Sequence, residues 1–170
     1  MTLYLMRHAE AGSADARRWP DDRLRPLSAR GHREHAVMAQ ALRRMGVRFD
    51  RVLTSPLLRA RQTAEITAKA FGGRIPLEET DALGDEARTK DLLKVLRGLP
   101  RRASVAAVGH EPFLSKAVAA LVSSDGSAHV QMRKSGVAAL EFEGRPKRGR
   151  GTLLFHLRPR EVIALARGGA

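Results

Sequence analysis

A basic residue and a histidine end the first apolar run of the chain. Residues 2–8 read Thr-Leu-Tyr-Leu-Met-Arg-His, so strand-forming side chains lead directly into Arg7 and His8. In open α/β sheets, ligands bind just beyond the carboxyl ends of the strands. At such an edge, Arg7 and His8 would offer a fixed cation and a potential nucleophile.

Two later segments have the same construction. An apolar run at 51–54 leads into Ser-Pro, in which Ser55 can cap a helix and the proline can begin it, so that Arg59 falls in the first turn. A further apolar run at 104–108 ends in Gly-His-Glu-Pro, which places His110 just after a strand. Three strands would thus deliver basic or imidazole side chains to one edge of one sheet.

An edge of this composition suits a phosphoryl group. The guanidinium groups of Arg7 and Arg59 can each make bidentate contacts to phosphate oxygens. The helix N-termini expected after Ser55 and His110 would add N–H donors and a favourable dipole. A histidine with a free ring nitrogen can attack phosphorus, and a second one can stabilise the charge on the equatorial oxygens.

The order of these motifs resembles that of the histidine phosphatases in the phosphoglycerate-mutase-like superfamily. That superfamily is marked by Arg-His-Gly near the N-terminus, by Ser-Pro-x-x-Arg-Ala-x-Gln-Thr, and by a later Gly-His. The matching segments here are Arg-His-Ala at 7–9, Ser-Pro-Leu-Leu-Arg-Ala-Arg-Gln-Thr at 55–63 and Gly-His-Glu-Pro at 109–112. The resemblance extends from about residue 2 to residue 157.

Three features most resemble the small phosphohistidine phosphatase branch, the SixA type. They are the short chain, Ala9 in place of the usual glycine, and Pro-Leu-Ser-Ala-Arg-Gly at 26–31. The resemblance implies that His8 is a nucleophile that forms a phosphohistidine, which water then hydrolyses. It implies that Arg7, Arg59 and His110 hold the phosphate oxygens. No cofactor is expected, and no metal, because the cations and helix ends supply the positive charge.

Larger members of the superfamily use a carboxylate, located after the strand that follows the second helix, to protonate the leaving group. The corresponding stretch here, 78–86, is rich in acidic residues. Matching Leu-Gly-Asp to the family's Leu-x-Glu indicates Asp85, with Glu86 next to it. An equally good interpretation is that both carboxylates simply begin a helix, where the dipole favours negative charge.

The spacing of apolar residues predicts a mostly parallel sheet with helices on both faces and an antiparallel edge hairpin, which is a three-layer α/β sandwich. The resemblance implies the same architecture, that of phosphoglycerate mutase. The whole chain, residues 1–170, is expected to form one domain. The expected strands are 2–7, 51–54, 75–78, 104–108, 129–133, 136–143 and 151–157. The expected helices are 28–45, 56–71, 86–98, 112–122 and 159–166.

Other polar residues have structural interpretations. His32 and His35 have the i, i+3 spacing of a metal-binding pair, but no further ligand accompanies them, so a solvated helix face is predicted. Ser55 lacks the Gly-x-Ser-x-Gly context of a nucleophile and is predicted to be a helix cap. Glu10 would repel phosphate, so it is expected to support the loop or to orient a neighbouring arginine.

Composition limits the classes of function. The net charge of +13 fits either a solvated arginine-rich surface or an acidic partner. The chain has no cysteine, its first apolar run leaves no room for a signal peptide, and no run is long enough to span a membrane, so a cytoplasmic protein is expected. The basic run at 145–150 lacks aromatic residues for base stacking, which argues against nucleic acid, and a monomer is expected.

Three functions remain open at this stage. The first is a phosphatase that acts on phosphohistidine in proteins, which is favoured because the short stretch between 54 and 104 leaves no residues for a lid over a small metabolite. The second is a phosphomonoesterase for a small molecule. The third is a basic module that binds nucleic acid or acidic protein, which explains the charge but not why the candidate site residues follow strands.

Overall fold

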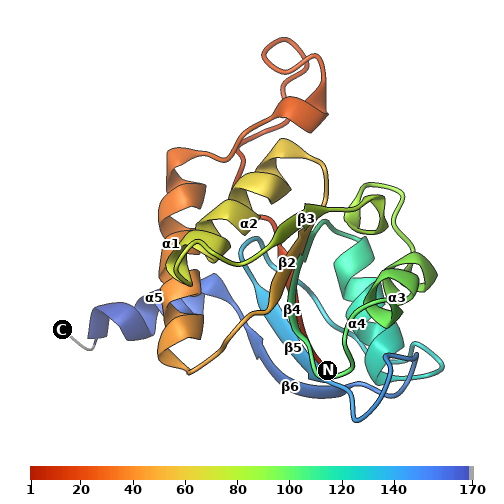
Figure 1. Ribbon diagram of the computed structural model, residues 1–170. Helices are drawn as coiled ribbons and strands as arrows, with labels where there is room; N and C mark the ends of the chain where they lie inside the picture. Colours follow the sequence, from red (N-terminus) through yellow and green to blue (C-terminus); the bar gives the residue numbers. More distant parts are fainter. Residues whose placement is uncertain (169–170) are drawn as a thin grey trace.

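A six-stranded sheet forms the centre of the structure, a computed structural model in which residues 1–168 are described (Figure 1). The strand order is β3-β2-β4-β1-β5-β6. Neighbours among β1 to β4 are parallel, whereas β5 pairs antiparallel with both β1 and β6. The strands are β1 (Thr2–Arg7), β2 (Arg51–Thr54), β3 (Leu77–Glu79), β4 (Ser104–Gly109), β5 (Val137–Glu141) and β6 (Thr152–Leu157). The predicted mostly parallel sheet with an antiparallel edge hairpin is confirmed.

Helices cover both faces of this sheet, as Figure 1 shows. Side chains alternate along β1, so that Leu3 and Leu5 pack in the core beneath α3 and α4, while Tyr4 and Met6 pack toward α1, α2 and α5. The helices are α1 (Ala29–Arg44), α2 (Leu58–Ala70), α3 (Thr89–Arg97), α4 (Phe113–Val122) and α5 (Pro159–Gly168), with short 3₁₀ turns at Asp22–Leu24 and Asp81–Leu83. Two buried cores, one on each face, therefore hold the sheet rigidly in place.

The register of the parallel strands brings their carboxyl ends to one edge. Arg7, the last residue of β1, lies opposite Gly109, the last residue of β4, and Thr54 at the end of β2 lies opposite Val108. The residues that follow these three strands are therefore neighbours. This edge is the one at which the sequence predicted a site.

One predicted strand, 129–133, is wrong. Its backbone bonds to side chains instead of to a neighbouring strand: Met132 N–H donates to Ser115 Oγ at 3.0 Å, and the Met132 carbonyl accepts from Arg7 Nη1 at 3.0 Å. The alternation of apolar residues in this stretch reflects Met132 inserting into the core. The segment crosses the end of β1 as an irregular loop.

Two predicted helix starts are also wrong. The helix expected at 86–98 begins at Thr89, so Asp85 and Glu86 lie in the preceding turn and do not begin a helix. The helix expected at 56–71 begins at Leu58, with Leu57 rather than Ser55 at its N-cap position. Both changes release polar side chains from capping and leave them free for other contacts.

Candidate active site

Two histidine side chains lie next to each other where β1 and β4 end. The His8 N–H donates to the Gly109 carbonyl at 3.0 Å, which extends the parallel pairing by one residue and fixes His8 beside His110. The ring centroids of His8 and His110 are 5.0 Å apart. Both rings are nearly buried, with 7% and 5% of their surface exposed. Residues far apart in the sequence thus form one compact imidazole pair.

The surroundings of His8 hold its ring neutral and fix its tautomer. Nδ1 lies 2.7 Å from the carbonyl oxygen of Ala9, so Nδ1 bears the hydrogen and donates, and Nε2 has a free lone pair. Burial, followed by the positive charge available on His110 and on nearby Arg59 and Arg7, lowers the pKa of His8 to about 3. At neutral pH the ring is therefore an unprotonated base with one accessible nitrogen.

Ser55 orients His110 and is not a helix cap, which corrects the prediction. Ser55 Oγ accepts from Leu57 N–H at 3.2 Å and lies 2.8 Å from His110 Nε2. When the Ser55 hydroxyl donates its hydrogen to Nε2, the imidazole hydrogen of His110 lies on Nδ1. Nδ1 of His110 is buried with no partner among the described residues. Burial, and then the charge of Arg59, lower the pKa of His110 to about 4.

Arg59 is held by a residue that the sequence reasoning missed. Its Nη1 donates to the main-chain oxygen of Asp22 at 2.8 Å and lies 3.1 Å from the Asp22 carboxylate. Nε of Arg59 is buried and has no partner among residues 1–168. Asp22 begins the 3₁₀ turn Asp22–Leu24, and the surrounding sequence, Arg-Trp-Pro-Asp-Asp-Arg, has no pattern that would connect it with α2. Only the folded loop brings the two together.

Arg7 has a similar arrangement, with one end fixed and the other without a partner. Its Nη1 donates to the carbonyl of Met132 at 3.0 Å, and its Nε is buried with no partner in the described part of the chain. Buried N–H groups without a partner are uncommon in folded proteins and call for an explanation. Nitrogens of Arg7, Arg59 and His110 all share this property at the edge of one sheet.

The motif that follows Arg59 fastens the loop that follows His8. Thr63 Oγ1 accepts from the Ala9 N–H at 3.0 Å and donates to the Arg59 carbonyl at 2.7 Å. Gln62 Oε1 accepts from Leu27 N–H at 2.7 Å, at the far end of the same loop. The Gln-Thr pair therefore connects α2 to both ends of the loop that follows His8. Its two side chains hold the loop in place by bonding to the loop's backbone.

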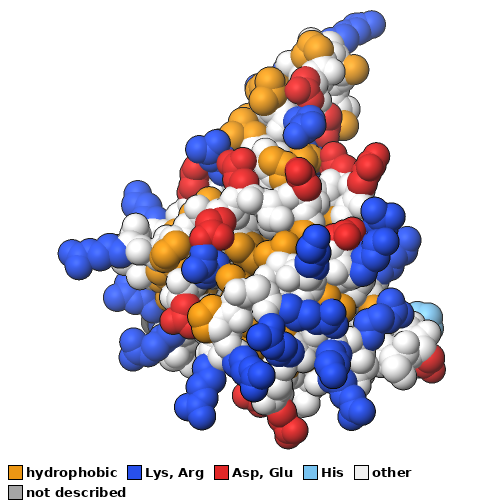
Figure 2. Space-filling model, turned by 45° about the vertical axis from the view of Figure 1, so that its right-hand side comes forward, with side chains coloured by type: hydrophobic (Ala, Val, Ile, Leu, Met, Phe, Trp, Pro, Cys, Tyr) orange, Lys and Arg blue, Asp and Glu red, His pale blue; other side chains and the backbone are white. Residues whose placement is uncertain are grey.

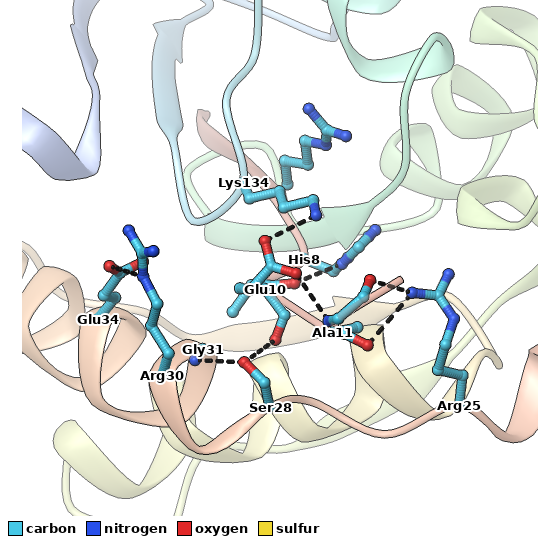
Figure 3. A network of polar contacts seen from close by, with 12 residues as sticks. His8, Glu10, Ala11, Arg25, Ser28, Arg30, Gly31, Glu34 and Lys134 are labelled. Atoms are coloured by element: carbon cyan, nitrogen blue, oxygen red, sulfur yellow. Dashed lines mark hydrogen bonds and ion pairs between the residues drawn. The ribbon is translucent and has the colours of Figure 1, made fainter. Parts of the chain in front are cut away.

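Glu10 supports the loop, as the sequence predicted. Its carboxylate accepts from Gly12 N–H and from Lys134 Nζ, each at 2.7 Å, and its main-chain oxygen accepts from Ser28 Oγ at 3.2 Å (Figure 3). A Cβ on Gly31 would lie 2.0 Å from that same oxygen, so only glycine allows α1 to approach the loop this closely. The carboxylate is turned toward Lys134 and is neutralised by it.

Asp85 lies at the rim of the site, in the turn before α3. The side chain is exposed, and its negative charge acts to raise the pKa of both Arg59 and His110, which places it near these two groups. Asp85 and Glu86 also line a groove of about 700 Å³ beside α4. Of the two candidate acids, Asp85 is the one whose charge acts on site residues.

Two further histidines, His32 and His35, belong to α1. His35 is fully buried and its Nε2 lies 2.9 Å from Thr67 Oγ1, so the predicted solvated helix face is wrong for His35, whereas His32 is exposed as expected. Burial lowers the pKa of His35 to about 4. Within residues 1–168, no three His, Cys, Asp or Glu side chains come together as a metal ion would require. No helix in that range is long and apolar enough to cross a bilayer.

Comparison with known proteins identifies relatives over nearly the whole chain. Residues 3–87 match the model of the histidine phosphatase superfamily, branch 1. The phosphohistidine phosphatase SixA of Escherichia coli is 30% identical over 164 residues, covering 94% of each chain. An uncharacterized protein of Picosynechococcus sp. is 35% identical over 142 residues, covering 82% of this chain and 84% of its own.

A solved structure agrees with these sequence matches. The protein histidine phosphatase SixA complexed with tungstate superimposes with a TM-score of 0.81 at 28% identity, over 95% of this chain and 99% of that one. Tungstate is a tetrahedral oxyanion like phosphate. The predicted phosphoglycerate-mutase-like histidine phosphatase fold is therefore confirmed.

Proposed function

The chain belongs to the histidine phosphatase superfamily and to its SixA-type branch, and from this premise we propose that this phosphatase acts on phosphohistidine in proteins. The observation that supports the proposal most directly is the state of His8. Its ring is neutral, its Nδ1 is occupied by a main-chain carbonyl, and its Nε2 is free beside three side chains that have buried N–H groups without partners. A phosphoryl group accounts for all of these features.

In the proposed first step, the lone pair of His8 Nε2 attacks phosphorus in line with the leaving group. A new P–N bond forms as the P–N bond of the substrate breaks, and the departing imidazole takes a proton from solvent or keeps the one on its own ring. The resulting phosphohistidine on His8 is then attacked by water. This second step releases inorganic phosphate and restores the neutral ring.

The three equatorial oxygens of the phosphoryl group are held by Arg7, Arg59 and His110 in this proposal. Nε of each arginine and Nδ1 of His110 are buried and have no hydrogen-bond partner among the described residues. In this proposal, each of them donates a hydrogen bond to a phosphate oxygen. Since these donors are buried and fixed by Met132, Asp22 and Ser55, they need no reorganisation when charge develops in the transition state. The positive charge of the two guanidinium groups takes the place that Mg²⁺ occupies in kinases.

The short connection from β2 to β4 favours a phosphorylated protein as the substrate. From β2 to β4 the described chain forms only α2, β3, a 3₁₀ turn, α3 and short loops, and these elements pack against the sheet. A phosphoryl group presented on a protein surface can reach an uncovered edge. The relative named phosphohistidine phosphatase points to the same chemistry.

Asp85 is the one observation that favours a second candidate, a phosphomonoesterase for a small molecule. An alkyl phosphate leaves as an alkoxide and depends on a general acid, whereas imidazole is a good leaving group once protonated. A carboxylate at the rim, near Arg59 and His110, is where such an acid would lie. Comparing the two substrate classes therefore tests the proposal.

Trapping the covalent intermediate tests the mechanism. The phosphatase is mixed with a [³²P]phosphohistidine peptide, quenched with alkaline SDS within milliseconds, and analysed on a gel. We expect a label on the protein that survives alkali and is lost in acid, as a phosphoramidate would be. The His8→Ala variant should take up no label, whereas the matched variant His32→Ala, with the change at an exposed position on α1, should label normally. Labelling of His8→Ala would refute the assignment of the nucleophile.

Treatment with EDTA tests the metal-free part of the proposal. We expect kcat/KM for the phosphohistidine peptide to change less than about twofold after chelation and gel filtration, because the positive charge comes from Arg7 and Arg59. The measurement is repeated with added Mg²⁺ or Zn²⁺. A loss of activity that either metal restores would contradict this part.

A further inference from the structure

We propose that a basic groove beside the phosphate-binding edge binds an acidic segment of the protein that presents the phosphohistidine. This inference rests on the proposed function and extends it to the identity of the partner. The basic groove is lined by six cations, Arg7, Arg30, Arg133, Lys134, Arg158 and Arg160, together with three glutamates and a few apolar residues. Its volume is about 950 Å³.

The basic groove is continuous with the candidate active site. Arg7, a proposed phosphate ligand, is one of its lining residues. The other walls come from the first turns of α1, from the irregular loop that crosses the end of β1, and from the start of α5. Figure 3 looks into this region, with Lys134 over Glu10, the Arg30–Glu34 pair on α1 to one side, and His8 nearby. A peptide that places its phosphoryl group on Arg7 would therefore continue into the groove.

All three glutamates of the basic groove are already paired. Glu10 contacts Lys134 at 2.7 Å, Glu34 contacts Arg30 at 2.6 Å, and Glu161 contacts Arg158 at 2.5 Å. These ion pairs neutralise three of the six cations, Lys134, Arg30 and Arg158. Three positive charges remain after the pairing, on Arg7, Arg133 and Arg160.

Arg133 and Arg160 are the two of these that the phosphoryl group does not engage. Both are exposed, and within residues 1–168 neither forms an ion pair. Arg133 lies near enough to Arg7 for its charge to act on the pKa of that guanidinium, and Glu111 acts on the same group more strongly in the opposite direction. Among the described residues, Arg133 and Arg160 have no such carboxylate in an ion pair with them, so carboxylates on a bound segment can pair with both. The groove therefore complements acidic side chains on the segment that follows or precedes the phosphohistidine.

The composition of the basic groove favours an acidic peptide over nucleic acid. Single-stranded nucleic acid is bound by cations interleaved with aromatic side chains, on which the bases stack. No aromatic residue lines this groove; its apolar members are Pro159, Ile163 and Ala164. Small aliphatic surfaces beside unpaired arginines suit an extended peptide that carries Asp or Glu.

Positive charge alone does not distinguish the basic groove from the rest of the surface, because other parts of the surface are also basic. Figure 2 shows Lys and Arg side chains gathered over the lower half of the molecule, the end at which the β5–β6 loop lies in Figure 1. That loop includes Lys147 and Arg150, both exposed. Because β5 runs antiparallel to β1, this loop lies at the opposite edge of the sheet from His8. It therefore provides a control of equal charge.

The experiment compares two double variants that each remove two positive charges, Arg133→Gln/Arg160→Gln in the basic groove and Lys147→Gln/Arg150→Gln in the β5–β6 loop. The substrates are two phosphohistidine peptides, one flanked by Asp and Glu and one flanked by Ser and Gln. We expect the groove variant to lower kcat/KM for the acidic peptide by roughly five- to twentyfold, the effect of losing two solvent-exposed ion pairs. The neutral peptide should change less than about twofold, and the control variant should leave both peptides unchanged.

Binding measured apart from turnover separates this inference from the proposed function. Fluorescence anisotropy is recorded with the same two peptides, labelled with fluorescein and not phosphorylated. Weaker binding of the acidic peptide by the groove variant alone supports the inference even if neither phosphohistidine peptide is hydrolysed, a result that would refute only the proposed function. Equal losses for both peptides, equal effects of the two variants, or binding of an oligonucleotide as tight as that of the acidic peptide would overturn the inference.

Discussion

The strand ends and the loops around them contribute opposite charges to the candidate active site. Arg7, His8 and His110 come from β1 and β4 or follow them directly, and the two rings are almost entirely buried. Asp22 and Asp85 come from exposed loops and face solvent. The rigid sheet thus fixes the groups proposed to bind phosphate, while the two carboxylates near these groups lie where sequence and conformation vary most easily.

The two regions act in opposite directions on one group, His110. Burial lowers its pKa most, the charges of Arg59 and Arg7 lower it further, and the carboxylates of Asp85 and Asp22 raise it. Arg59 also depends on both regions: its guanidinium faces the site, and the loop residue Asp22 holds it in place through a hydrogen bond. The following experiments separate the contribution of the strand ends from that of the loops.

Removing the nucleophile should have the largest effect. We expect His8→Ala to abolish hydrolysis of phosphohistidine peptides and of aryl phosphates alike, because the covalent route then has no first step. Phosphate release is followed over hours at high enzyme concentration, with circular dichroism to confirm that the variant is folded. Turnover at the wild-type rate would refute the covalent mechanism.

Removing one phosphate-binding donor should cost less. For Arg59→Ala or His110→Ala we expect kcat to fall by about 10²–10³-fold, the usual effect of losing one donor to a developing oxyanion. Steady-state kinetics on an aryl phosphate measure this loss. The matched control is Arg61→Ala, on the exposed side of the same helix, where the ion pairs with Glu65 and Glu79 are on the surface. A loss for Arg61→Ala as large as that for Arg59→Ala would contradict the assignment.

The same division between strand ends and loops separates what the sequence could predict from what it could not. Parallel strands end at a common edge, so apolar runs that lead into Arg7, into Ser55 and into His110 were sufficient to bring those residues together. The hairpin of β5 and β6 could be predicted because two strand-like stretches flank a short basic run that is bounded by Gly144 and Gly151. These inferences depend only on local pattern and on the general geometry of sheets.

The errors occurred where the backbone bonds to distant side chains. Residues 129–133 alternate like a strand, but Ser115 and Arg7 take the hydrogen bonds of Met132 that a neighbouring strand would take. Ser55 has the pattern of a cap, yet His110 is within its reach only in the folded chain. Asp22 could not be found at all, because its contact with Arg59 spans 37 residues and involves its main-chain oxygen. Local patterns contain no information on such partners.

Changing the loop carboxylate should have an effect that depends on the substrate. We expect Asp85→Asn to slow hydrolysis of alkyl phosphates by about 10²-fold, the lower end of the range for a general acid, since Asp85 is exposed. Phosphohistidine peptides should slow less than about threefold, because imidazole leaves readily. The kcat/KM values of both substrates are compared for Asp85→Asn and for Glu86→Gln.

Any of three outcomes would change this assignment. Equal small effects of Asp85→Asn on both substrates would mark it as a structural residue of the turn, and a larger effect of Glu86→Gln would identify the neighbouring carboxylate as the acid. A wild-type preference for an alkyl phosphate by a wide margin in kcat/KM would favour the small-molecule phosphomonoesterase. The roles of His8 and Arg59 would be unaffected in each case.

The smallest expected effects are shifts in the pKa values of the two site histidines. An ordinary histidine has a pKa near 6.5, so about 97% of such rings would be protonated at pH 5. With a pKa of about 3 for His8 and about 4 for His110, both rings should still be mostly neutral at that pH. In NMR spectra of the histidine ring carbons, we expect neither resonance to move between pH 8 and pH 5, with assignments taken from His8→Gln and His110→Gln.

The direction of further shifts distinguishes the strand ends from the loops. Removing a positive charge with Arg59→Gln should raise the pKa of His110, because protonation then meets less repulsion, and Asp85→Asn should lower it, because an attractive charge is lost. Added inorganic phosphate should raise the pKa of His8, since a dianion beside the ring favours the protonated form. If His110 titrated near 6.5 in the wild type, or if both variants moved its pKa in the same direction, burial and opposing charges would not explain the neutral imidazole pair.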